Sequence, residues 1–165
     1  MPGYFSSVSP PYTVGETRTV FDWPSMIKRS AAVPPWALQE AVFAVMFAAA
    51  TCDGRLSGTE RELLLSLVHR SRALRSLGHD TIERFNASIV RRLEIGGRDA
   101  LAEACSAIPL ELRLPLFAQS LDIVLADGEL TQEEAAFLNA IARYLELSET
   151  DVRRVADVII LKNRV

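Results

Sequence analysis

The chain has 165 residues, 49% hydrophobic and 24% charged, which is enough for one globular domain with a buried core. Its net charge of −3 gives no general attraction to nucleic acid, so we predict no nucleic-acid partner. The two cysteines, Cys52 and Cys105, lack metal-type spacing and have no histidine beside them in sequence. We therefore interpret them as small buried hydrophobic residues in a reducing compartment.

Residues 1–34 are interpreted as an irregular, Pro-rich N-terminal arm. Six of the eight prolines fall within residues 1–35, and no helical periodicity is found there. A basic segment followed by an apolar one, which would indicate secretion, is also missing from this stretch, so we expect a cytoplasmic protein. The aromatic residues Phe21 and Trp23 flank Asp22 in the arm. Either the arm is disordered, or these two residues dock on the domain or on a partner protein.

Residues 35–165 are predicted to form an all-α domain, because period-two alternation never holds for the length of a strand. The first helix opens at Pro34-Pro35 and carries the uncharged run 41–52. This run spans about 18 Å, against about 30 Å for a bilayer core, and is apolar on every side. It predicts a central core helix, and no other run approaches the length of a membrane span. Six further helices are expected at about 58–76, 80–94, 98–107, 110–126, 132–146 and 149–162.

One pattern occurs twice, in residues 52–64 and again in residues 126–138. The matched positions are Asp53 and Asp127, Gly54 and Gly128, Leu56 and Leu130, Ser57 and Thr131, Glu60 and Glu134, and Leu64 and Leu138. Each copy follows a long apolar run. Internal similarity of this kind predicts an architecture of two related helical halves.

Most of the repeated pattern is explained by how one helix ends and the next begins. Gly54 and Gly128 supply the positive φ that a helix end commonly needs. Ser57 and Thr131 stand at N-cap positions, and a glutamate follows three residues later in both copies. This is the capping-box pattern, in which each cap contributes about 1 kcal/mol.

The two aspartates are not explained in this way. A carboxylate in the last turn of a helix faces the negative end of the helix dipole, at a cost of about 0.3–1 kcal/mol. Asp53 and Asp127 therefore either accept hydrogen bonds from amides of the following turn or hold a cation. A set of Asp and Glu without Cys or His suits Ca²⁺, Mg²⁺ or Mn²⁺ and argues against structural zinc. The ligand spacing of an EF-hand is not met.

The second half of the chain, from about Asp99 to Arg164, resembles the tellurite-resistance TerB-like family. The resemblance is carried by the apolar helix Pro115–Ala126, the run Ala-Asp-Gly-Glu-Leu-Thr at 126–131, Glu134, and the run 141–148. The first half looks like a less regular copy. The resemblance implies a compact seven-helix domain of two related halves. It also implies metal-chelating acidic residues at the turns, which here are Asp53, Glu60, Asp122, Asp127 and Glu134.

We expect a non-catalytic domain of tellurite-resistance or stress-response type that binds a divalent cation and docks partner proteins. The alternative is a purely structural protein-interaction module without a metal site. An enzyme is disfavoured, because His69 and His79 lie on or beside an arginine-rich helix and no nucleophile is framed by a turn motif. Residues 61–98 hold eight arginines against four acids, which we interpret as a solvated face. Oligomeric state is not predicted.

Overall fold

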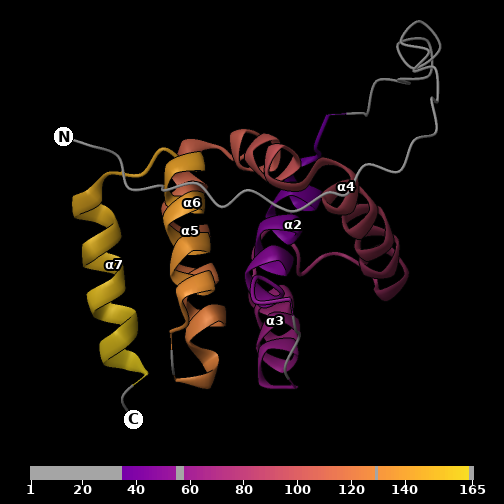
Figure 1. Ribbon diagram of the computed structural model, residues 1–165. Helices are drawn as coiled ribbons and strands as arrows, with labels where there is room; N and C mark the ends of the chain where they lie inside the picture. The colour runs from indigo at the N-terminus through magenta and orange to yellow at the C-terminus, as the bar shows by residue number, and fades with distance from the viewer. Residues whose placement is uncertain (1–34, 55–57, 129, 164–165) are drawn as a thin grey trace, which may run out of the picture. The chain divides into compact units, whose positions relative to one another are not determined.

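The structure is a computed structural model that describes residues 35–54, 58–128 and 130–163. Within these residues it contains six α-helices and one 3₁₀-helix, and none of them lies in a strand. The prediction of an all-α domain is confirmed for this part of the chain. The elements are α2 (Leu38–Ala50), α3 (Gly58–Arg70), α4 (His79–Ser106), α5 (Leu110–Val124), η1 (Leu125–Asp127), α6 (Gln132–Tyr144) and α7 (Glu149–Lys162) (Figure 1).

Helix α2 is the centre of the core, as its apolar sequence predicts. Every residue from Ala41 to Met46 is buried, and so are Ala49 and Ala50. The helix packs against α4 and α5 and also contacts α3 and α6 (Figure 1). A helix with neighbours on most sides has little surface in contact with solvent, and for this reason its sequence shows no polar stripe.

The predicted count of seven helices is not confirmed for the described residues, because two of the expected helices run together as α4. Gly97 adopts φ 52° and ψ −127° inside α4, so the chain kinks there without forming a separate loop. Gly96 lies at the same bend, and a Cβ on it would come within 2.7 Å of the Ala100 Cβ. The two glycines therefore mark a bend inside one element. The architecture of two related halves stays a prediction.

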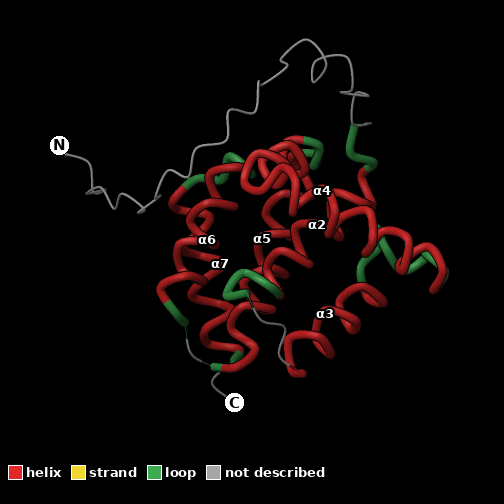
Figure 2. The backbone as a smooth tube through the Cα atoms, turned by 45° about the vertical axis from the view of Figure 1, so that its right-hand side comes forward, coloured by secondary structure: helices red, strands yellow, loops and turns green. Residues whose placement is uncertain are grey.

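Helix α3 ends at Arg70, earlier than the predicted boundary at residue 76. The amide of Ser71 still donates to the carbonyl of Leu67, and the amides of Leu74 and Arg75 then both donate to the carbonyl of Ser71. The resulting turn brings Leu74 into the core, where it is fully buried. Figure 2 shows the turn as a short loop between α3 and α4.

Arg113 on α5 holds the ends of two other helices. Its Nε donates to the carbonyl of Ile108, just after α4, at 3.0 Å. Its Nη1 donates to the carbonyl of Leu145, at the end of α6, at 3.3 Å and pairs with the Glu146 carboxylate at 2.5 Å. Carbonyls at helix ends lack intrahelical partners, so one half-buried guanidinium satisfies two of them at once.

Helix α7 lies at the edge of the bundle and packs mainly against α5 (Figure 1). Its N-cap is Ser148, whose hydroxyl accepts a hydrogen bond from the Asp151 amide at 3.1 Å. None of its side chains is fully buried, and Val158 and Leu161 are exposed. No helix among the described residues is long and apolar enough to cross a membrane.

Candidate functional site

The two Asp–Gly turns have closely similar backbones. Gly54 has φ 79° and its amide donates to the carbonyl of Thr51 at 2.9 Å. Gly128 has φ 83° and its amide donates to the carbonyl of Leu125 at 3.1 Å. The prediction of a positive φ at both glycines is confirmed. In both turns the hydrogen bond spans three residues and the aspartate directly precedes the left-handed glycine.

The second capping box is formed as predicted. The Thr131 hydroxyl accepts from the Glu134 amide at 3.2 Å, and the Glu134 carboxylate accepts from the Thr131 amide at 2.7 Å. Glu134 is buried, with only 6% of its surface exposed. The corresponding position of the first copy, Ser57, and the side chain of Glu60 lie outside the described residues. The first capping box therefore stays a prediction.

Asp122, one of the five predicted cation ligands, is bound within the fold. Its Oδ1 and Oδ2 accept from Lys162 Nζ at 2.5 and 2.7 Å, and Oδ1 also accepts from the side-chain amide of Asn163 at 3.3 Å. Glu134 is likewise engaged through its cap. Two of the five acids thus have a structural role that does not require a metal.

The remaining three acids belong to the turns and to α3. Asp53 is exposed at the first turn. The side chains of Glu60 and Asp127 lie outside the described part of the structure, although their backbones belong to α3 and η1. Helix α3 packs against η1, so the two elements that carry these acids meet. Among the described side chains, no three of the His, Cys, Asp and Glu residues come together as a metal site. The predicted cation site therefore stays a prediction.

The predicted docking residues Phe21 and Trp23 lie outside the described residues. The structure instead shows two features that the sequence did not reveal. The first is a cluster in which the Arg92 guanidinium lies 3.4 Å from the centre of the Trp36 ring and pairs with Glu40 at 3.5 Å. Ser88 also donates to Glu40, at 2.9 Å. The two halves of this cluster lie about fifty residues apart in sequence, and no local pattern indicates such a pairing.

The second feature is a pocket of about 310 Å³ between α2, α5 and the turn after α3. Its lining residues are Val42, Arg70, Ser71, Arg72, Ala73, Leu112, Pro115, Leu116 and Gln119. In the sequence, the arginines were visible only as part of a basic stretch. Their position at the mouth of an apolar pocket depends on the packing of α5 against α2 and α3.

Both cysteines are at least partly buried. Cys105 is fully buried on α4, and Cys52 is half-buried after the end of α2. Burial raises the pKa of the Cys105 thiol to about 12, although the charge of Arg113 acts in the opposite direction. A thiol with so high a pKa is protonated at neutral pH and is a poor nucleophile. The interpretation of Cys105 as a buried hydrophobic residue agrees with this environment.

Together these observations define, over the described residues, an all-α domain with two matched Asp–Gly turns. The family model described as Tellurite resistance protein TerB matches residues 39–157. The chain therefore belongs to the TerB family. A search of curated proteins and a search of solved structures each found no match.

Proposed function

We propose that this TerB-family chain is a non-catalytic domain of tellurite-resistance or stress-response type that acts in the cytoplasm by binding. Its ligands are a divalent cation, held weakly at the Asp–Gly turns, and partner proteins. The observation that supports the cation most directly is the packing of α3 against η1. This packing joins the helix that carries Glu60 to the turn that ends at Asp127, with Asp53 on the turn before α3.

The donor set determines which cations fit. Asp53, Glu60 and Asp127 offer only carboxylate oxygens, which suit Ca²⁺, Mg²⁺ or Mn²⁺. Acids that approach one another repel, and a divalent ion relieves the repulsion. Asp122 and Glu134 fit less well, because Lys162 and Thr131 already bind them. They would join a cation only after giving up those bonds, which accounts for weak binding in our proposal.

Thermal melting tests the cation proposal. The protein is first treated with EDTA and then melted with Ca²⁺, Mg²⁺ or Mn²⁺ in excess. A cation bound only by the folded state adds RT ln(1 + [L]/Kd), about 2.7 kcal/mol at a hundredfold excess over Kd. We expect the rise in Tm to be lost in Asp127→Asn and kept in Asp157→Asn. Asp157 is an exposed acid on α7, so the control makes the same change of charge on another helix.

The alternative is an interaction module without a metal site. The observation that favours it is the internal engagement of Asp122 and Glu134, which need no cation. An identical Tm for the EDTA-treated wild type with and without each cation would select this alternative. Turnover of a generic phosphoester or peptide that Asp127→Asn abolishes would instead overturn the non-catalytic assignment.

A further inference from the structure

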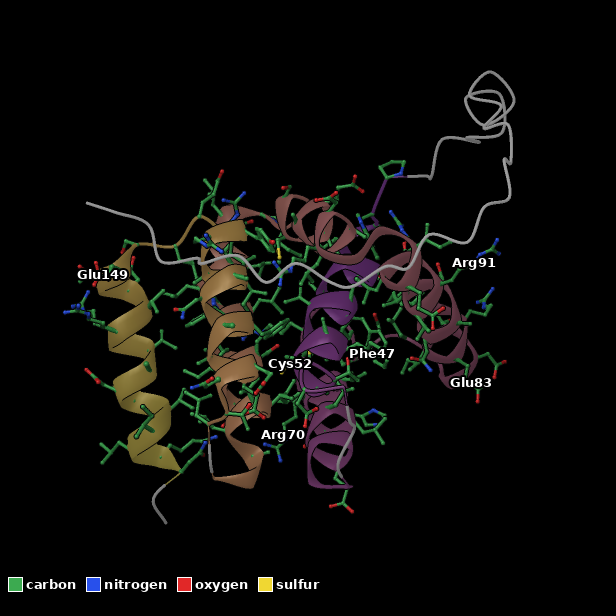
Figure 3. All side chains as sticks on the ribbon, in the orientation of Figure 1. Phe47, Cys52, Arg70, Glu83, Arg91 and Glu149 are labelled. Carbon is green, nitrogen blue, oxygen red and sulfur yellow. The ribbon has the colours of Figure 1, made fainter. Side chains whose placement is uncertain are left out.

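The pocket beside the α3–α4 turn has an apolar floor and a basic rim. Val42 of α2 and Leu116 of α5 are buried at its base, and Leu112 of α5 is half-buried beside them. Arg70, the last residue of α3, and Arg72 in the following turn are both exposed at its mouth. In Figure 3 Arg70 is labelled beside the ribbon of α3, on the side toward the overlapping ribbons of α5 and α6. An apolar cavity and two guanidinium groups thus face the same volume.

The positive charge of this rim is not neutralised within the described residues. Arg70 and Arg72 form no ion pair or hydrogen bond with described partners, in contrast to Arg113, which pairs with Glu146. The described residues that line the pocket include no acid. Residues 63–79 contain no Asp or Glu at all, and Arg75 adds a third positive charge to the same turn. A guanidinium that no described carboxylate pairs with presents a planar fork of donors that fits the carboxylate of a partner.

We propose that this pocket binds a short segment of a partner protein in which a large apolar side chain stands beside an acidic residue. The apolar side chain enters between α2 and α5, and the neighbouring carboxylate pairs with Arg70 and Arg72. This proposal rests on the partner docking of the proposed function and names its surface. It does not depend on the cation.

The size and charge of the pocket favour this occupant. Its volume of about 310 Å³ lies at the lower end of the range of about 300–1,000 Å³ for ligand pockets. A volume of this size accommodates one or two side chains. Arginines at the mouth and apolar groups at the base match a ligand with both characters. Such a segment gains affinity from apolar burial and specificity from the charge-assisted bonds.

Fluorescence anisotropy with two labelled peptides tests the proposal in the presence of EDTA. The probe is Ser-Asp-Phe-Asp-Leu-Asp-Ser, and its charge-reversed control is Ser-Lys-Phe-Lys-Leu-Lys-Ser. We expect only the acidic peptide to bind, and its affinity to fall with added salt. The double variant Arg70→Glu/Arg72→Glu should weaken binding by about tenfold or more, because two charge-assisted contacts become repulsive.

Two further variants separate the pocket from general electrostatics. Arg154→Glu makes the same change of charge on α7, away from the pocket, and should leave the affinity unchanged. Gln119→Trp keeps both arginines and fills the pocket from α5, and should also weaken binding by about tenfold or more. Equal binding of the two peptides, or equal binding by wild type and the double variant, overturns the proposal.

Other occupants give different results. If decanoate displaces the probe and binds more tightly than it does, the pocket is a site for a small carboxylate and the peptide proposal is wrong. If the probe binds only after residues 1–34 are deleted, the chain's own N-terminal segment is the occupant, which also overturns it. Absence of peptide binding together with an intact cation-dependent rise in Tm rejects this pocket and leaves the cation proposal standing.

Discussion

The ammonium group of Lys162, at the end of α7, donates to both carboxylate oxygens of Asp122 on α5, at 2.5 and 2.7 Å. The Asp122 side chain is 14% exposed and the Lys162 side chain 53% exposed, so solvent reaches the lysine more than the aspartate. The contact fastens an edge helix that has no fully buried side chain. It also means that a residue expected to bind a cation already has a cationic partner within the fold.

Replacing Lys162 by methionine tests both consequences. The side chain keeps most of its apolar stem and loses the charge, so we expect the free energy of unfolding to fall by about 0.5–1 kcal/mol. The loss should shrink in about 1 M NaCl, where exposed charges are screened. Urea unfolding of Lys162→Met and of a control, Arg154→Met, measures it.

Lys162→Met also tests whether Asp122 is a ligand of the proposed cation. If this carboxylate contributes to cation binding, Lys162→Met frees it and enlarges the cation-dependent rise in Tm. An unchanged rise would show that Asp122 serves only to hold α7.

The second capping box should make a measurable contribution to stability. We expect Thr131→Ala and Glu134→Ala each to cost about 1 kcal/mol, because each leaves an amide at the start of α6 without its partner. The two side chains act on one another's backbone amides, so the double variant should cost less than the sum of the single ones. Urea denaturation gives all three values. Glu133→Ala, at the exposed neighbouring position, should stay within about 0.5 kcal/mol of wild type.

Alanine at Gly128 tests the backbone of the second turn. A Cβ there would meet no atom within 4 Å, so any cost arises from the φ of 83° alone. We expect a loss of about 1–2 kcal/mol, and a similar loss for Gly54→Ala, which has φ 79°.

The matched control is Gly58→Ala at the start of α3. This position also has open space around a Cβ, but its backbone is helical. Alanine there should be neutral or stabilising by up to about 1 kcal/mol. Chemical denaturation would contradict the interpretation if all three variants changed stability equally.

The buried thiol of Cys105 predicts a loss of stability at alkaline pH. Burial raises its pKa from 9.0 to about 12 in the folded state. Above pH 9 the unfolded chain therefore releases a proton that the folded chain retains, and stability falls as the pH rises toward 12. This contribution is fully present below pH 9. The slope is at most about 1.4 kcal/mol per pH unit.

Urea midpoints of wild type and Cys105→Ala between about pH 8 and pH 10 measure this slope. We expect the variant to lose less stability than wild type over this range, although its cavity lowers stability at every pH. Parallel pH profiles of the two proteins would show that the thiol does not contribute. Thiol labelling at about pH 8 should likewise modify Cys105 only after unfolding.

Features that depend on neighbouring residues could be predicted from the amino-acid sequence. The helical class follows from apolar periodicity, and the central position of α2 follows from an apolar run without a polar face. The left-handed glycines Gly54 and Gly128 and the cap at Thr131 were also predictable. These residues satisfy the unpaired backbone N–H and C=O groups of a helix end, and their partners lie within a few residues in the sequence.

Contacts between groups far apart in the sequence follow from how the helices pack. Asp122 pairs with Lys162 forty residues away, and Arg113 reaches the carbonyl of Leu145 across thirty-two residues. The pocket rimmed by Arg70 and Arg72 exists only because α5 packs beside α3 and α2. A carboxylate or guanidinium has the same local sequence pattern whether it binds a cation, a partner or another helix. Its role depends on which charged groups the packed helices place close to it. Hydrophobic periodicity does not indicate which groups these are.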